Sequence, residues 1–156
     1  MLSRLQGASD RDTVVQSLLL PMLPDTTLTL LLLPKDDVAQ ALAAWGSPLP
    51  SDQVRALVVP LNAHSLLQQA HLNKQVCSGR TEGDTVQSMI STYLRAPDAA
   101  GGYAFPVCIG ERVANLIYAQ TARPIEPSEL AKLTRVSASA AEAYRRLIRA
   151  RRAKRA

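Results

Sequence analysis

The sequence predicts an α+β domain, built as a twisted antiparallel sheet of five or six strands with the N- and C-terminal helices packed on one face. Three observations support this class. A helical pattern lies near the N-terminus, several apolar segments follow with short turns between them, and the chain ends in a β-hairpin and one long helix. Strands joined by short turns pair antiparallel. Helices at the two ends of the chain can then cover one face as a second layer.

In the first half of the chain, apolar positions spaced for one helical face predict a helix over Asp10–Met22. The continuously apolar segment Thr26–Leu33 is typical of a strand buried on both faces. Val38–Trp45 is predicted as the next strand, although its alanine content also permits a helix. A strand over Ala56–Leu61 and a short helix over Ser65–Asn73 follow.

The middle of the chain is predicted to be loosely folded. Cys77–Gly79 is expected to be a short extended piece, Val86–Leu94 a helix, and residues 97–102 a flexible connection. Beyond it, Tyr103–Ile109 and Arg112–Gln120 predict a hairpin around Gly110-Glu111, because glycine permits the tight two-residue turn. A long helix is expected from about Ser128 to Arg152, with arginines in its last turn that favour the helix dipole.

The composition fits one globular domain, with 47% apolar and 20% charged residues among 156. We expect a flexible N-terminus over residues 1–9, one domain over 10–148 and a basic tail over 149–156. Residues 1–144 hold 11 basic and 13 acidic residues, so the net charge of +5 comes from the C-terminal end. The basic cluster there consists of Arg145, Arg146, Arg149, Arg151, Arg152, Lys154 and Arg155.

No apolar run approaches the roughly 20 residues that cross a bilayer, and charged residues precede the first apolar stretch, unlike a signal peptide. We therefore expect no membrane insertion and a cytoplasmic location. Two cysteines favour reduced thiols over a disulfide framework. No metal site and no cofactor are expected, because His64 and His71 lack a third ligand at suitable spacing.

Three segments resemble a GAF domain: the hairpin Phe105–Ala119, the helix entry Arg123–Leu130, and the run Ser65–Gly79. The resemblance implies terminal helices on one face of the sheet, a ligand pocket on the other, and often dimerisation through those helices with a signalling output. The Asn-Lys…Phe…Asp-Glu set of cyclic-nucleotide-binding members and a cysteine for chromophore attachment are missing. The resemblance is therefore compatible with a degenerate or empty pocket.

Five residues are candidates to line such a pocket: Trp45, Cys77, Tyr93, Tyr103 and Phe105. Ordinary core packing is the alternative for each of them. Some GAF-like proteins reduce free methionine sulfoxide with loop cysteines, but Cys108 lies in a predicted buried strand, where a cysteine behaves as a small hydrophobe. Catalytic residues are not expected.

The closing helix is the strongest functional feature. Its heptad positions are only partly apolar, so it does not predict an autonomous coiled coil, whereas its small central residues let a facing helix approach. The candidate dimer or partner interface comprises Leu18, Leu133, Ser137, Ala140, Tyr144 and Leu147.

Three interpretations of the basic tail are ranked in this order: a solvated helix end, a binding site for an acidic protein partner, and a binding site for nucleic acid. The sequence thus predicts a non-catalytic regulatory or sensory module that forms a homodimer or docks a protein partner. Whether the module binds a small-molecule ligand is left open. The alternatives are a structural adaptor in a larger cytosolic assembly and a GAF-type free methionine sulfoxide reductase.

Overall fold

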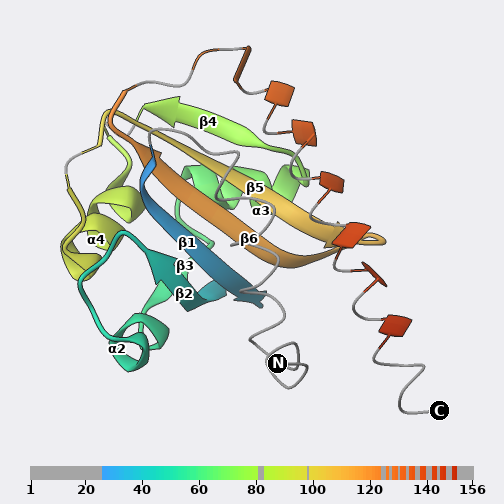
Figure 1. Ribbon diagram of the computed structural model, residues 1–156, viewed down its shortest axis with the longest axis horizontal. Coiled ribbons are helices and arrows are strands. Elements are labelled where there is room, and N and C mark those ends of the chain that lie inside the picture. Colours follow the sequence, from blue (N-terminus) through green and yellow to red (C-terminus); the bar gives the residue numbers. More distant parts are fainter. Residues whose placement is uncertain are drawn as a thin grey trace.

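The computed structural model describes residues 26–80, 83–97, 99–123 and 126, and part of the residues between 128 and 150. In chain order its elements are β1 (Thr26–Lys35), β2 (Val38–Trp45), α2 (Ser51–Arg55), β3 (Val58–Pro60), α3 (Leu66–Asn73), β4 (Cys77–Arg80), α4 (Thr85–Leu94), β5 (Gly101–Ile109) and β6 (Arg112–Thr121) (Figure 1). The predicted helix over Asp10–Met22 and the predicted flexible residues 1–9 lie outside the described residues.

The strands form one six-stranded sheet in the order β3-β2-β1-β6-β5-β4, and every neighbouring pair is antiparallel. The predicted α+β class and the antiparallel sheet are confirmed. β1 lies in the middle, because its apolar run TLTLLLL is satisfied only when a strand pairs on each side and both faces are covered. Its Leu30, Leu31 and Leu32 are fully buried.

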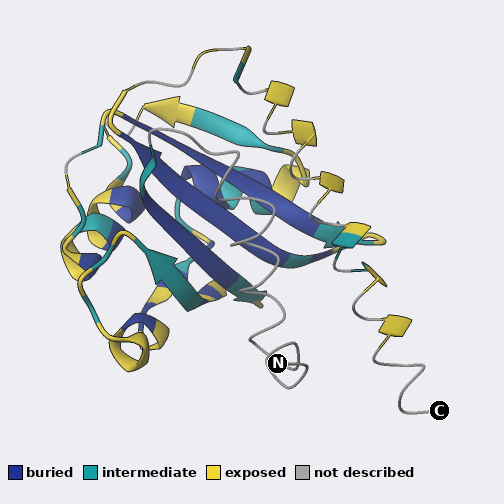
Figure 2. Ribbon diagram, viewed as in Figure 1, coloured by how far each residue is buried: buried dark blue, intermediate teal, exposed yellow. Residues whose placement is uncertain are grey.

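Alternate side chains of the strands enter two apolar layers, one on each face of the sheet. The first, here called the α3–α4 core, joins Leu30 and Tyr118 to side chains of α3 and α4 such as Leu67 and Ile90. The second, here called the opposite core, contains Leu31, Phe105 and Ile117. The strands β1, β6 and β5 between the two layers are mostly dark blue in Figure 2, whereas β4 at the sheet edge is teal and yellow.

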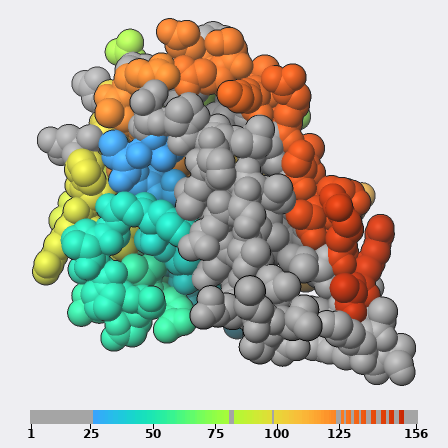
Figure 3. All heavy atoms as spheres, viewed as in Figure 1, coloured from blue at the N-terminus to red at the C-terminus, as the bar shows by residue number. Residues whose placement is uncertain are grey.

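The described residues between 128 and 150 that have a secondary structure are helical, and we call this element the C-terminal helix. Ala143 packs against the opposite core, and Glu129 forms an ion pair with Arg123, 2.8 Å apart. These two contacts place the helix on the face of the sheet away from α3 and α4. Figure 3 shows its described residues along one outer side of the molecule.

Four local predictions need correction. Ser51–Arg55 forms α2, where the sequence predicts no element, and the third strand is limited to Val58–Pro60. The extended piece predicted over Cys77–Gly79 is confirmed as the edge strand β4, whose four residues all pair with β5, but the prediction that this part of the chain is loosely folded is wrong. β5 begins at Gly101, inside the predicted flexible connection, because Gly101 and Gly102 pair with both β4 and β6.

Candidate functional site

A buried polar cluster lies where α4 crosses the end of β6, on the α3–α4 face. Gln87 and Ser91 come from successive turns of α4, and Tyr118 and Gln120 come from β6. Gln87 Nε2 donates to Ser91 Oγ at 2.8 Å, while Gln120 Nε2 donates to Ser91 Oγ at 2.7 Å and to Tyr118 Oη at 3.1 Å. Buried polar groups are costly unless they find such partners. The four side chains therefore satisfy one another inside the fold.

The chemistry of this cluster is that of neutral groups. Burial raises the pKa of Tyr118 far above its ordinary value; the hydrogen bond from Gln120 opposes that rise and the charge of Asp84 adds to it. The phenol therefore keeps its proton over the physiological pH range. It has neither the charge nor the pKa that general acid–base catalysis near neutral pH requires.

Asp84 connects the N-termini of α3 and α4. Its Oδ1 accepts from the backbone N–H of Gln87 at 2.9 Å, and its Oδ2 accepts from the N–H of Leu66 at 3.3 Å. Ser65 completes the start of α3, since its Oγ accepts from the N–H of Gln68 at 3.1 Å. One carboxylate thus meets the positive ends of two helix dipoles and links the N-termini of the two helices.

A small hollow of about 180 Å³ opens beside Asp84. Its lining combines two basic side chains with polar and apolar ones: His64, Ser65, Leu66, Gln69, Arg80, Gly83 and Asp84. Pockets for small-molecule ligands usually have about 300–1,000 Å³. This hollow has room for about six water molecules at roughly 30 Å³ each, which is too little for a nucleotide.

A second hollow, of about 230 Å³, lies at the other end of the molecule between β2 and α2. It is lined by Leu42, Ala43, Ala44, Trp45, Leu49, Ser51, Val54 and Arg55. It is likewise smaller than an ordinary ligand pocket. Trp45 is half-buried there and packs against the opposite core.

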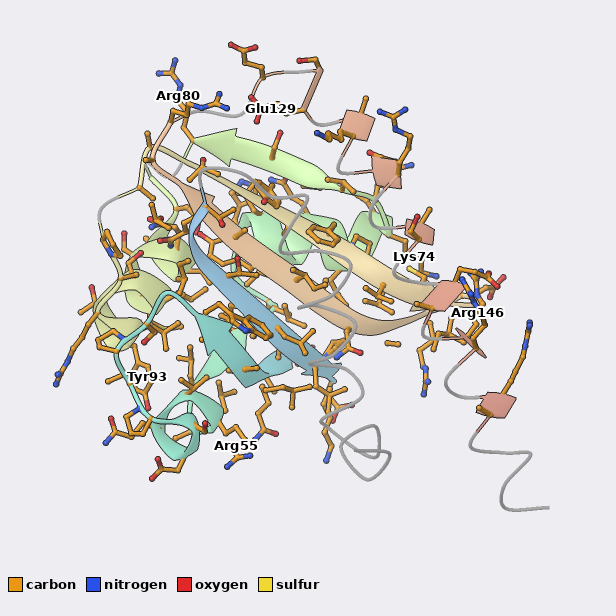
Figure 4. All side chains as sticks on the ribbon, viewed as in Figure 1. Arg55, Lys74, Arg80, Tyr93, Glu129 and Arg146 are labelled. Carbon is orange, nitrogen blue, oxygen red and sulfur yellow. The ribbon has the colours of Figure 1, made fainter. Side chains whose placement is uncertain are left out.

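The five predicted pocket residues do not come together. Cys77 packs against the α3–α4 core, whereas Tyr103 and Phe105 are buried in the opposite core with ring centroids 6.1 Å apart. Tyr93 is exposed, and its hydroxyl donates to the Gln53 carbonyl at 2.8 Å, which ties α4 to α2 (Figure 4). The strand register explains the split, because Cys77 faces Ala104, the residue between the two aromatic ones.

The two cysteines lie apart and are poor nucleophiles. Cys77 pairs with Ala104, and Cys108 follows four residues later on β5, a separation of about 13 Å along the strand. A disulfide needs Cα atoms about 4.4–6.8 Å apart. Burial raises the pKa of both thiols, which lowers the fraction of reactive thiolate at neutral pH. Within the described ranges, no group of three or more His, Cys, Asp or Glu side chains could hold a metal ion.

The six interface candidates, Leu18, Leu133, Ser137, Ala140, Tyr144 and Leu147, all lie outside the described residues, so they stay predictions. In the C-terminal basic cluster, Arg145 is half-buried and Arg146 and Arg149 are exposed. Arg151, Arg152, Lys154 and Arg155 lie outside the described part. In the part that is described, no helix is long and apolar enough to span a bilayer.

Sequence reasoning missed Asp84, Gln87 and Gln120. A signal for the first two was present, because an aspartate followed three residues later by glutamine is a capping-box pattern at a helix start. Ser91 and Gln87, four residues apart, also share one face of α4. Gln120 gave no local signal, since only the sheet topology brings it under that helix.

No protein-family model matches the sequence, and no curated protein matches it. Several solved structures, in contrast, are similar to this chain. The second GAF domain of DevS from Mycobacterium smegmatis is similar with a TM-score of 0.71 at 19% identity, over 94% of this chain and 99% of that one. The GAF domain/HD domain protein from Geobacter sulfurreducens is similar with a TM-score of 0.67 at 18% identity, over 92% of this chain and 97% of that one.

A third similar structure is fRMsr of Staphylococcus aureus in complex with its substrate, with a TM-score of 0.56 at 8% identity, over 78% of this chain and 73% of that one. The element order, the antiparallel sheet and these similarities together identify the fold. The chain has the fold of a GAF domain.

Proposed function

We propose that this chain is a non-catalytic regulatory module that acts through protein contacts of its terminal helices, as a homodimer or with a partner, and not through a bound metabolite. One observation carries this proposal. The face on which a GAF-type ligand pocket is expected is occupied by the α3–α4 core, whose polar side chains satisfy one another. Two hollows lined by described residues, of about 180 and 230 Å³, are both smaller than an ordinary ligand pocket.

The protein contacts are proposed for the opposite face. The C-terminal helix lies there, with Ala143 toward the sheet. Small side chains such as Ser137 and Ala140, together with Leu133 and Leu147, are the sequence features that suit a facing helix. An apolar contact between the C-terminal helices of two copies would stabilise a dimer, because it removes apolar surface from water.

A sulfoxide reductase is the less favoured alternative. It would require a reactive thiolate, and burial shifts both thiols away from that state. The two cysteines are also too far apart to form the disulfide that a paired-thiol reductase uses. Turnover of free methionine sulfoxide with a thiol reductant, lost in a Cys77→Ser variant, would establish the reductase and overturn the regulatory proposal.

Native mass spectrometry of protein purified without added ligand tests the proposal directly. We expect a dimer mass with no bound small molecule. Ala140→Arg should convert the dimer to monomer, because a long cation replaces a small side chain at the proposed contact. Ser139→Arg is the matched control, since Ser139 is not among the proposed contacts and points about 100° away from Ala140 around the same helix. A monomer mass at tens of micromolar would contradict the homodimer and leave partner docking as the proposed role. A co-purified metabolite at full occupancy would contradict action through protein contacts alone.

A further inference from the structure

Basic residues from three distant parts of the sequence gather at one end of the sheet. Ile109 at the end of β5, Val76 before β4 and Ala143 on the C-terminal helix all pack against the opposite core. These contacts bring together the segments that carry the basic residues: Lys74 after α3, Arg112 opposite Ile109, and Arg145, Arg146 and Arg149 on the helix.

Electrostatics supports the same grouping. Burial raises the pKa of the Cys108 thiol, and the charges of Lys74 and Arg145 both oppose that rise. The two cations therefore face one thiol from different elements, although they are far apart in the sequence. Figure 4 shows Lys74 and Arg146 at the same end of the molecule, beside the tip of the β5–β6 hairpin.

Most of these charges are free to meet a partner. Lys74, Arg112, Arg146 and Arg149 are exposed. The fifth cation, Arg145, is half-buried and forms an ion pair with Glu142 at 3.1 Å, within one helical turn.

Few acids balance this group. Among the described residues, Glu111 and Glu142 are the acids nearest to the cations in sequence, so the five cations keep an excess of positive charge. Asp36 and Asp37 lie at the same end of the sheet, but in the β1–β2 turn, and β6 separates β1 from β5.

An exposed leucine lies close to Lys74 in the sequence. Leu72, near the end of α3, has 67% of its surface exposed, more than any other large apolar side chain in the described part. It precedes Lys74 by two residues. A charged surface with an apolar anchor suits an acidic polypeptide that carries apolar side chains. A nucleic acid offers no such apolar side chain.

We propose that Lys74, Arg112, Arg145, Arg146 and Arg149, together with Leu72, form one composite basic surface that docks an acidic, amphipathic segment of a partner protein. This inference rests on the proposed regulatory role and names the partner surface for it. Complementary charge sets the association rate and the register of such a complex, while the leucine contributes buried apolar area.

Fluorescence anisotropy with four probes tests the chemistry of the surface. The probes are a labelled peptide that alternates Glu and Asp with Leu, a poly-glutamate peptide of equal charge, a short DNA duplex, and phosphatidylserine vesicles. We expect the Leu-containing peptide to bind most tightly and to weaken when salt rises from about 0.05 M to about 0.5 M, because the Debye length shortens. Tighter binding of the duplex or the vesicles, or no binding of the peptide, would overturn the inference.

Two charge reversals test whether the surface is composite. Lys74→Glu and Arg112→Glu should each raise the dissociation constant of the Leu-containing peptide about fivefold, and Leu72→Ser should remove its preference over poly-glutamate. Arg135→Glu is the matched control, since Arg135 is exposed on the C-terminal helix about 15 Å before Arg145. If Arg146→Glu weakens binding but Lys74→Glu and Arg112→Glu do not, the C-terminal helix acts alone and the composite surface is wrong.

The dimer mass of each variant separates this inference from the proposed function. Lys74→Glu lies outside the proposed dimer contacts, so its dimer fraction should equal that of the unmodified chain. A stable dimer without peptide binding would overturn only the composite surface. A monomer that still binds the peptide would overturn only the dimer.

Discussion

Replacing Asp84 should destabilise the fold more than removing an ordinary helix cap, because one carboxylate serves two helices. The 2.9 Å bond from the Gln87 N–H corresponds to a cap of about 1–1.5 kcal/mol. The longer 3.3 Å bond from the Leu66 N–H adds about 0.5 kcal/mol, and the two helix dipoles add a few tenths. We therefore expect Asp84→Ala to lower the free energy of unfolding by about 2 kcal/mol, or Tm by about 4–8 °C.

Ser65→Ala is the matched control, because Ser65 caps only α3 and its loss should cost about 1 kcal/mol. Asp84→Asn should fall between the two variants, since the amide keeps one acceptor oxygen but loses the charge. Urea unfolding gives the free energies, and hydrogen exchange should accelerate at two amides, those of Leu66 and Gln87. If Asp84→Ala costs no more than Ser65→Ala, or if only one amide responds, the shared cap is refuted.

Three further predictions concern backbone strain and ionisation. Gly46→Ala should lower the free energy of unfolding in urea by about 3 kcal/mol or more, because φ is +97° and the new Cβ would overlap the Thr27 carbonyl oxygen. Gly110→Ala, also at positive φ but in open space, should lower it by only about 1 kcal/mol. Equal losses in the two variants would show that the overlap at Gly46 is wrong. Burial raises the pKa of Tyr103 and Tyr118, so the native state holds protons that the unfolded state releases above about pH 10. Stability should then fall by about 1.4 kcal/mol per pH unit for each tyrosine, and Tyr103→Phe should halve that slope; a flat profile above pH 10 would refute the assignment. Both thiols should react with a disulfide reagent more slowly at pH 8 than a free cysteine, and a rate equal to that of the urea-unfolded chain would show that their raised pKa values are wrong.

The hairpin and the central strand could be predicted because their signals are local. Gly110-Glu111 between two apolar runs specifies a hairpin, and the run from Leu28 to Leu33 has no polar face to expose. The predicted bounds of β2, Val38–Trp45, agree with the structure. In each case the residue pattern within one segment was enough to predict the element.

Other parts depend on contacts between distant segments. Cys77–Arg80 has no strong strand pattern and becomes a strand because β5 offers it a free edge. The five-residue α2 contributes one buried side chain, Val54, which is too few for a periodic signal. The candidate pocket residues were chosen for their residue types, whereas the alternation along β5 assigns Tyr103 and Phe105 to the face away from Cys77.

The position of β1 also sets the order in which this chain can fold during synthesis. Its partner β6 is made late, and Thr27 bonds to Gln120 across 93 residues of sequence. At about 5–20 residues per second, the ribosome needs roughly 5–20 s to make that stretch. Until then the leucine-rich inner edge of β1 stays unpaired, a state that favours aggregation. The sheet of this domain is therefore completed only by its last hairpin, and slower translation lengthens the exposure of its most hydrophobic strand.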